Sequence, residues 1–348
     1  MNALKQRLIE HVRENGPMTV ADFMALCLYD PEDGYYTQHA SIGGANADFL
    51  TAPESSQMFG ELIGLWCAHE WDVLGQPAFN LIELGPGRGV LMQDALRATQ
   101  RIEGFHAAAH LTLVETSPVL RNEQAERVPT AEWAERIDEA PNGPSIIVAN
   151  EFLDCLPIRQ FVKADGEWRE KLVGLNDADQ LIFGLSAPLP APETEDDDGA
   201  VREIAPALES LIYEFERRLH AHPGRVLLID YGYAKPGGYD TLQALKNHKP
   251  ADPLDAPGEA DLTAHVDFAQ VAHLAREAGL DVAGPITQSA FLLALGLGER
   301  ADMLTKANPD RADRIAREVH RLTDESAMGA LFKVLCISSP NLPPPAGF

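Results

Sequence analysis

Three glycines stand in five positions at the end of a short apolar run, within NLIELGPGRGVL at residues 80–91. Glycine reaches positive φ and lets the backbone approach a bulky ligand, at an entropic cost that packing alone rarely requires. A dinucleotide fingerprint would read G-x-G-x-x-G, but Val90 stands in place of its third glycine. A phosphate loop would need a lysine after the glycines, and none follows. The predicted ligand-binding turn therefore has glycines at alternate positions, namely Gly85, Gly87 and Gly89.

An acidic residue, Glu83, stands two positions before the first glycine, and Pro86 lies between the first two glycines. A carboxylate at the carboxyl end of a strand can hold the ammonium group of a ligand, directly or through water. The combined pattern, acidic-x-G-x-G-x-G, is similar to the first motif of class I methyltransferases that use S-adenosylmethionine. It indicates a nucleoside ligand with an aminoacyl group, bound without phosphate recognition.

A second acidic residue, Glu115, ends the next apolar run, LTLVE at 111–115. A carboxylate at this position can accept both hydroxyl groups of a ribose. Because nicotinamide enzymes use the same arrangement, Glu115 supports a nucleoside but does not distinguish the two cofactors.

The stretch VANEFLDCLPIRQF at 148–161 carries a third polar group. Asn150 and Glu151 fall where another core strand ends, and ligands of such folds bind at the carboxyl ends of strands. If a helical turn follows, Asp154 projects to the same side as Glu151. Two carboxylates there could grip a guanidinium group through paired hydrogen bonds. The alternative is a helix start at which Asn150 or Glu151 serves as a cap.

Further candidates lie in three other regions of the chain. Glu54 is a possible catalytic residue and Thr51 a possible cofactor contact, although this stretch could equally supply helix caps. Asp230 and Tyr231 follow a core strand and are candidate substrate contacts. The remaining substrate candidates are Asp48 and His265, and a histidine in such a setting is more often packed than catalytic.

Short apolar runs alternate with helical patterns, which is typical of a doubly wound α/β sheet with helices on both faces. The helical stretches VLMQDALRATQRI and SPVLRNEQAERV separate the first three strands, and SSQMFGELIGLWCAHEWDVLG precedes them. The terminal part of the chain has the spacing of two last strands, possibly a hairpin. The predicted core strands are residues 80–84, 111–115, 145–150 and 225–231.

The α/β order is interrupted after Pro157 by two alternating segments joined at Asp165-Gly166, a hairpin signal. We read residues 249–261 as a loop and the proline-rich end as a tail without a core to join. The predicted organisation is an N-terminal helical segment at 1–75, a core at 76–157 and 224–340, an inserted α+β segment at 158–223, and a tail at 341–348.

The chain has 348 residues, of which 45% are hydrophobic, and a formal net charge of −25. Such a charge repels phosphate backbones, so we expect no nucleic-acid partner. No Cys/His pattern has metal-ligand spacing, and the four cysteines lie in apolar surroundings typical of buried thiols in a reducing compartment. Neither a signal peptide nor an apolar stretch of about 18 residues is apparent, which predicts a cytoplasmic protein without a membrane span.

Taken together, several motifs in one order resemble the MidA-like family, which includes the mitochondrial complex I assembly factor that methylates an arginine of a core subunit. The resemblance runs from about residue 10 to the last strand and is carried by DGYYT (33–37), DFLTAPESSQMFGELIG (48–64), ELGPGRG (83–89), NEFLDCLP (150–157), DYGY (230–233) and DLTAHVDF (261–268).

The resemblance implies a Rossmann-like class I methyltransferase sheet, S-adenosylmethionine as donor, and an N-terminal segment and insert that shape the substrate cleft. It further implies a protein substrate with an arginine acceptor, for which a complex I subunit is one candidate, and the chain is expected to be a bacterial relative of the mitochondrial enzyme. Methylation of a small molecule, or an assembly chaperone that binds the donor without turnover, are the alternatives. A homodimer is possible, since an apolar segment such as SAFLLALGLGERADML could form either core or dimer face.

Overall fold

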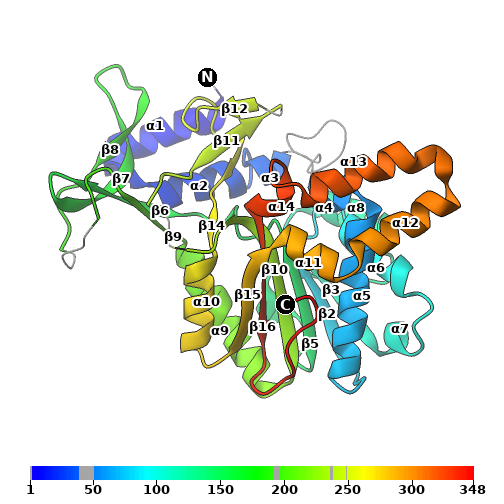
Figure 1. The fold of residues 1–348 in the computed structure, drawn as a ribbon. Helices are drawn as coiled ribbons and strands as arrows, with labels where there is room; N and C mark the ends of the chain where they lie inside the picture. Colours follow the sequence, from blue (N-terminus) through cyan, green and yellow to red (C-terminus); the bar gives the residue numbers. More distant parts are fainter. Residues whose placement is uncertain (1, 39–50, 191–195, 236–237, 248) are drawn as a thin grey trace.

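The computed structural model describes residues 2–38, 51–190, 196–235, 238–247 and 249–348. At its centre lies a mostly parallel sheet with the strand order β4-β3-β2-β5-β10-β16-β15 (Figure 1). Among these seven strands β16 runs opposite to the other six, and the short β14 (Val266–Asp267) pairs in parallel with the last residues of β10. The four predicted core strands are confirmed. The strands are β2 (Phe79–Leu84), β3 (Ala109–Val114), β4 (Glu132–Ala134), β5 (Ser145–Asn150), β10 (Gly224–Tyr233), β15 (Asp281–Thr287) and β16 (Phe332–Ser338).

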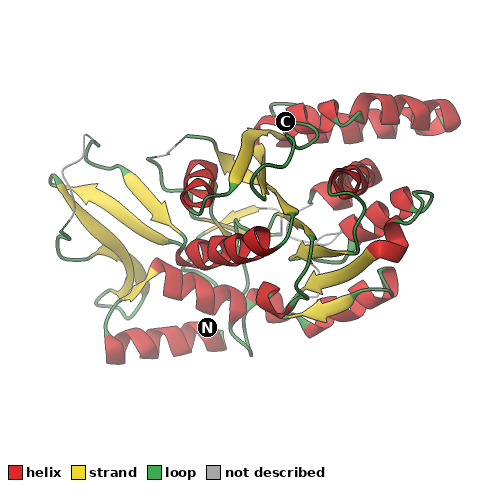
Figure 2. Cartoon of the chain, turned by 90° about the horizontal axis from the view of Figure 1, so that it is seen from below, coloured by secondary structure: helices red, strands yellow, loops and turns green. Residues whose placement is uncertain are grey.

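Helices cover both faces of this sheet, as predicted (Figure 2). Neighbouring strand residues point to opposite faces, so Leu227 joins one apolar core and Leu228 the other. Because both faces are buried, the strands are continuous apolar runs. One core includes α5 (Gln57–Val73), α6 (Val90–Thr99), α7 (Phe105–Ala108), α11 (Gln288–Ala294), α12 (Leu297–Ala307) and α13 (Ala312–Thr323). The other includes α9 (Pro206–Ala221) and α10 (Phe268–Glu277). The helix α8 (Pro118–Arg127) begins at a Ser117 cap.

The last two strands pair antiparallel, but they are not a tight hairpin. Helices α11, α12, α13 and α14 (Met328–Leu331) stand between them, and α12 and α13 project from the body of the molecule (Figure 1). None of the helices within the described ranges is long and apolar enough to cross a membrane.

The N-terminal segment and the insert share a second sheet and a third apolar core. The predicted hairpin at Asp165-Gly166 is present, with φ of 53° and 76° at its two turn residues. A strand from the N-terminal segment adds to the hairpin, so two regions far apart in sequence form one unit. This part contains α1 (Ala3–Asn15), β1 (Met18–Thr19), α2 (Val20–Tyr29), α3 (Tyr35–Gln38), β6 (Arg159–Ala164), β7 (Glu167–Leu175), β8 (Leu181–Leu185) and β9 (Val201–Ile204).

A third, three-stranded sheet corrects the prediction of a loop over residues 249–261. It consists of β11 (Gln243–Lys246), β12 (Lys249–Ala251) and β13 (Asp261–Thr263). The strands at the two ends of that range are too short to show an alternating pattern, and their prolines and acidic residues read as a loop. Ala244 and Leu262 are buried against the core of the N-terminal segment, and this packing stabilises the strands.

The prediction that the tail has no core to join is wrong. The tail lies over a buried ion pair between Glu70 and Arg225, whose Oε2 and Nε atoms are 2.6 Å apart. The backbone N–H of Ala346 donates to Glu70 Oε1 at 2.9 Å, and Arg225 donates to the carbonyl of Pro343. The Phe348 ring contacts Phe291. These contacts satisfy buried charges that could not be assigned partners from the sequence.

Removing one member of this pair should destabilise the fold. We expect Glu70→Ala to lower the free energy of unfolding by about 3–5 kcal/mol, since Arg225 would be left buried without a counter-charge. Asp72→Ala on the exposed side of the same helix is the matched control and should change it by about 0.5 kcal/mol or less. Urea denaturation measures the free energy of unfolding of both variants. Equal effects would show that the buried ion pair does not stabilise the fold.

Candidate active site

A cavity of about 920 Å³ opens where β2, β3 and β5 end. This is the position at which parallel α/β sheets bind ligands, because the loops after neighbouring strands diverge there. The structure brings together on its wall ten of the residues predicted from sequence, namely Thr51, Glu54, Glu83, Gly85, Pro86, Gly87, Glu115, Asn150, Glu151 and Asp154.

The glycine turn forms one side of the cavity, and its glycines have different tasks. Gly85 and Gly87 lie on the wall with φ of 62° and 51°. A Cβ on Gly85 would stand 2.8 Å from the Phe152 ring, so a side chain there would clash. Gly89 lies off the wall as the N-cap of α6, with φ of 77°, close to Gln124. Glycine is favoured at this position because of the positive φ and because the backbone packs closely against Gln124 of α8.

Glu83 is 2% exposed, and its Oε2 atom has no hydrogen-bond partner among the described residues. Burial raises the pKa of its carboxyl from the ordinary 4.5 to about 8. A buried carboxylate without hydrogen-bond partners destabilises the fold unless a bound ligand supplies the missing donor. The ammonium group of an aminoacyl ligand would supply both the counter-charge and the donor.

Glu115 is held in place by two donors. The backbone N–H of Ser117 donates to Oε1 at 2.8 Å, and Gln124 Nε2 lies 3.3 Å from Oε2. Gln124 also donates to the carbonyl of Gly87 at 2.6 Å and accepts from Trp133 Nε1 at 2.8 Å. Gln124 thus links Glu115 to the glycine turn. Sequence reasoning missed Gln124, although a fully buried polar residue of a helix indicates such a link.

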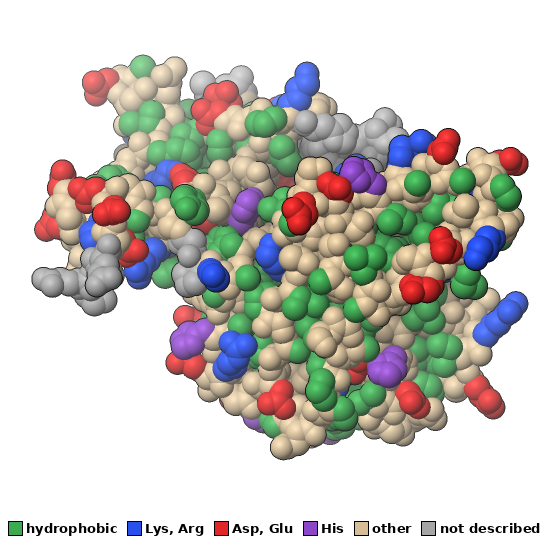
Figure 3. All heavy atoms as spheres, in the orientation of Figure 1, with side chains coloured by type: hydrophobic (Ala, Val, Ile, Leu, Met, Phe, Trp, Pro, Cys, Tyr) green, Lys and Arg blue, Asp and Glu red, His purple; other side chains and the backbone are tan. Residues whose placement is uncertain are grey.

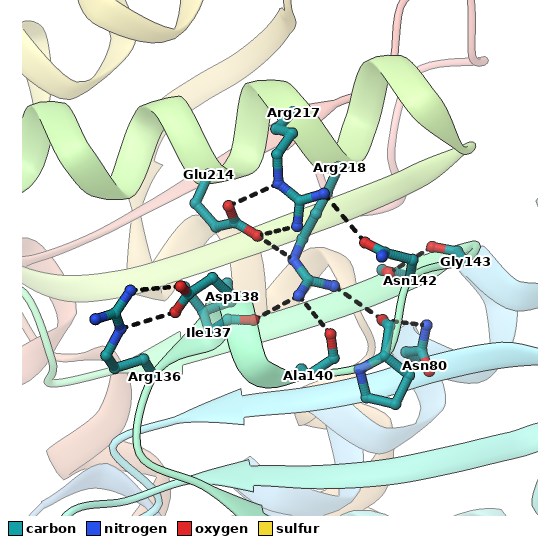
Figure 4. A network of polar contacts seen from close by, with 12 residues as sticks. Asn80, Arg136, Ile137, Asp138, Ala140, Asn142, Gly143, Glu214, Arg217 and Arg218 are labelled. Atoms are coloured by element: carbon teal, nitrogen blue, oxygen red, sulfur yellow. Dashed lines mark hydrogen bonds and ion pairs between the residues drawn. The ribbon is translucent and has the colours of Figure 1, made fainter.

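The loop after β4 forms another wall that the sequence did not reveal. Arg218 on α9 is buried and donates to the carbonyls of Ile137, Ala140 and Pro141 (Figure 4). Glu214 accepts from Arg218 at 2.7 Å. Ile137 and Asp138 of this loop line the cavity, together with Leu211 and Tyr213 of α9. The hydrogen bonds of Arg218 therefore connect α9 to the loop after β4, the two elements that form this wall.

The acidic end of the cavity is formed by Glu151 and Asp154. Glu151 has a φ of 51°, rare for a residue with a side chain, and its Oε1 accepts from Ala52 N–H at 3.0 Å and Asn150 Nδ2 at 3.1 Å. Burial raises the pKa of Glu151 to about 7 and that of Asp154 to about 6. A tyrosine hydroxyl, that of Tyr231, donates to Asp154.

No helical turn follows Asn150, so the condition under which these two acids were predicted to meet is not fulfilled. They meet because Asp230 lies beneath the turn. Its Oδ2 accepts from the backbone N–H groups of Phe152, Leu153 and Asp154 at 3.1, 2.8 and 3.2 Å.

Three of the four predicted substrate contacts, Asp230, Tyr231 and His265, do not line the cavity. Asp230 is 1% exposed and lies behind the acidic turn, as does Tyr231. His265 packs edge-on against the Tyr231 ring, at 5.5 Å between centroids, and burial lowers its pKa. Asp48 lies outside the described residues. Glu54, predicted to be catalytic, is paired with Arg88 at 3.4 Å, which also binds Glu123.

Several other predictions concern the surface and the thiols. Cys27, Cys67 and Cys336 are buried as expected, whereas Cys155 is half-buried and lines the cavity. On the face drawn in Figure 3, Lys and Arg side chains are scattered among acidic ones. Within the described residues, no group of three or more His, Cys, Asp or Glu side chains could hold a metal ion.

Comparison with known proteins decides what this site holds. Residues 62–286 match the family model of S-adenosyl-L-methionine-dependent methyltransferases. The chain belongs to this family. Its donor is S-adenosylmethionine, and Glu83, the glycine turn and Glu115 have the chemistry that this donor requires.

The resemblance seen in the motifs is confirmed by curated relatives. The chain is 35% identical over 344 residues to the Caenorhabditis elegans protein arginine methyltransferase NDUFAF7 homolog, mitochondrial, covering 89% of this chain and 80% of the relative. It is 33% identical to the Xenopus tropicalis NDUFAF7 protein, covering 100% and 89%. A Burkholderia thailandensis structure bound to S-adenosyl-homocysteine has the same fold, with a TM-score of 0.85, 24% identity and coverage of 99% and 94%.

Neutralising Glu83 should weaken binding of S-adenosylhomocysteine, which carries the ammonium group of the donor. We expect Glu83→Gln to raise its Kd at least about 10-fold, the loss of one charge-assisted hydrogen bond. Titration calorimetry measures this, and Glu132→Gln on the exposed strand β4 is the matched control. An unchanged Kd for S-adenosylhomocysteine in Glu83→Gln would show that Glu83 does not bind the ammonium group.

The same carboxyl should make the stability of the ligand-free protein pH-dependent. The folded state keeps a proton on Glu83 up to a pKa of about 8, whereas the unfolded chain releases it near 4.5. The free energy of unfolding should therefore fall as the pH rises from about 5 to about 8. Denaturant titrations should show a shallower fall in Glu83→Gln. A steeper or identical fall would contradict the raised pKa.

Proposed function

We propose that the chain methylates arginine side chains of a protein substrate, a subunit of a respiratory complex of the complex I type. The observation that carries the proposal is the adjacent pair of buried carboxyl groups, Glu151 and Asp154, on the wall of the donor cavity. The names of the curated relatives, protein arginine methyltransferases, support the same acceptor.

The chemistry required of the two acids follows from the acceptor. Bound S-adenosylmethionine supplies a methyl group on a sulfonium sulfur. A guanidinium nitrogen is a poor nucleophile while its lone pair is delocalised over the cation. Glu151 and Asp154 can accept hydrogen bonds from the other nitrogens, localise the positive charge there and orient the attacking nitrogen.

In the transfer, the new bond forms between that nitrogen and the methyl carbon as the carbon–sulfur bond breaks. The sulfur keeps the electron pair, and the nitrogen loses one proton. Glu151, with a pKa of about 7, is suited to accept this proton near neutral pH. Alignment of the acceptor supplies most of the acceleration, because the displacement is in line.

We place this activity in the bacterial cytoplasm, where complex I subunits would be reached before or during assembly. The four free cysteines, three of them buried, support a reducing compartment. The curated relatives are named as mitochondrial proteins.

Labelled donor added to lysate of a deletion strain tests the proposal. The wild-type chain should label a protein band, and the label should reside on arginine after hydrolysis. We expect Glu151→Gln to reduce the labelling rate by about 10²–10³-fold, as for loss of one group that stabilises charge in the transition state. Its affinity for S-adenosylhomocysteine should stay within about threefold, because the amide oxygen still accepts from Ala52.

Glu167→Gln, at the exposed first residue of strand β7, is the control with the same chemical change. A labelled small solute would instead indicate a small-molecule methyltransferase. Absence of label with intact donor binding would indicate an assembly chaperone without turnover.

The rate of methyl transfer should depend on pH through the same acids. Because a guanidinium is gripped only by ionised carboxylates, kcat/KM should rise with pH across the range of about 6 to 7, where the pair titrates, and then level off. Initial rates at constant ionic strength give this profile. A rate that falls between pH 6 and pH 8 would contradict binding of the guanidinium group by ionised Glu151 and Asp154.

A further inference from the structure

The last residues of β10, which lies between β5 and β16 (Figure 1), run past the end of β5 and lie beside the acidic turn. Ile229 pairs with Asn150, the last residue of β5, and its carbonyl accepts from the backbone N–H of Glu151 at 2.9 Å. The next two residues, Asp230 and Tyr231, are therefore level with the turn. Because neighbouring strand residues point to opposite sides, their side chains reach the turn from different directions.

The Tyr231 ring is held on two sides. Phe332, its partner across the pairing of β10 with β16, contacts it with 5.5 Å between ring centroids, and His265 packs edge-on at the same distance. Burial raises the pKa of the Tyr231 hydroxyl well above its usual range, so the hydroxyl keeps its proton at neutral pH. A fixed ring with a protonated hydroxyl is a hydrogen-bond donor of constant direction.

The Tyr231 hydroxyl donates to Asp154, and this contact favours the ionised form of the carboxyl. The other hydrogen bonds that favour this form come from backbone N–H groups. The carboxyl of Glu151 is held differently, by the backbone N–H of Ala52 and the side-chain amide of Asn150. The tyrosine contact therefore distinguishes the two acids of the pair.

Ionisable groups from several elements surround Asp154. Arg321 of α13 acts on the neighbouring Glu151 and lowers its pKa, so a cation also influences the pair. Because neighbouring carboxylates disfavour each other's ionisation, a donor on one of them decides which ionises first. The other groups are Cys155 of the turn, Asp230 and Tyr231 of β10, Asp261 of β13, Tyr29 of α2, Tyr36 of α3, and His265 and Lys333 beyond Tyr231.

We propose that Tyr231 is a positioning residue for methyl transfer, whose hydroxyl keeps Asp154 ionised and leaves Glu151 as the acid that takes up the proton. The inference rests on the arginine methyltransferase function proposed above and gives the two acids different roles. Asp154 supplies the negative charge that binds and orients the guanidinium group at neutral pH, and Glu151 accepts the proton that the attacking nitrogen loses. Tyr231 acts through Asp154 and does not itself line the cavity.

Carboxyl NMR measures the ionisation of Asp154 without turnover. Ligand-free, full-length protein labelled with 13C at the aspartate and glutamate carboxyl carbons is titrated from about pH 4 to about pH 9. The resonances of Asp154 and Glu151 are those missing from Asp154→Asn and Glu151→Gln. In the wild type, Asp154 should ionise at lower pH than Glu151.

Tyr231→Phe keeps the ring contacts with His265 and Phe332 and loses the hydroxyl group. We expect this variant to raise the midpoint of the Asp154 titration by about one pH unit, the effect of one hydrogen bond to the ionised form. Its Kd for S-adenosylhomocysteine should stay within about threefold of the wild-type value, which verifies that the donor site is folded.

Tyr233→Phe, two positions further along β10, is the matched control. It removes the same hydroxyl group from a tyrosine that lies beside Asp267 and Glu203. The midpoint of the Asp154 titration should not change in this variant.

The pH dependence of the rate is a readout that a purely structural role would not move. In Tyr231→Phe the rise of kcat/KM should shift to higher pH by at least about half a unit. At about pH 9, where both acids are ionised without the tyrosine, the rate should return to within about threefold of the wild type. A residue that only supports the fold would lower the rate equally at every pH.

The outcomes separate this inference from the function on which it rests. An unchanged Asp154 midpoint in Tyr231→Phe overturns it, and so does a wild-type protein in which Glu151 ionises before Asp154. The methyltransferase proposal stands after either result if the wild type labels arginine. If the midpoint shifts as expected but the wild type labels no arginine, the proposed function fails and the control of Asp154 by Tyr231 remains.

Discussion

One buried carboxylate determines the shape of the acidic end of the site. Asp230 accepts from three successive backbone N–H groups of the turn after β5, so the turn closes over it. The same turn places Glu151 at a positive φ and Asp154 on the cavity wall. A bend at the end of a strand exposes N–H groups that need acceptors, and a carboxylate beneath them supplies several at once. The positions of Glu151 and Asp154 thus depend on Asp230, an acid that does not itself line the cavity.

Several carboxyl groups with raised pKa values line the cavity. Glu83 has an orphaned oxygen, and burial raises the pKa values of Glu83, Glu151 and Asp154. Burying such groups costs stability in the ligand-free state, which the large apolar cores on both faces of the sheet offset. Both expected ligands are cationic, a sulfonium donor and a guanidinium acceptor. Binding of either therefore relieves a cost built into the fold.

Two parts of the fold contribute the walls of the cavity. The parallel sheet gives the glycine turn and the cavity-lining acids Glu83 and Glu115 a rigid edge. The N-terminal segment, the insert and the three-stranded sheet pack together in a separate core and approach this edge through α2, α3 and β13. Glu151 joins the two parts, because its carboxylate accepts from Ala52 at the start of α4 (Ala52–Ser55).

Local sequence patterns predicted the α/β class, four of the core strands, the helices between them, and the presence of Glu83, Gly85 and Glu115 at one edge of the sheet, where they line the cavity. These depend on local information: apolar periodicity, turn chemistry and the fact that parallel strands end at one edge. The positions of Asp230, Tyr231 and His265 behind the cavity wall, and the contacts of Gln124 and Arg218 that hold this wall, follow from the three-dimensional fold. It alone joined Tyr36 to Asp261 across 225 positions and the tail to Glu70 across 276. Such contacts arise from the packing of complete elements, which no local pattern encodes.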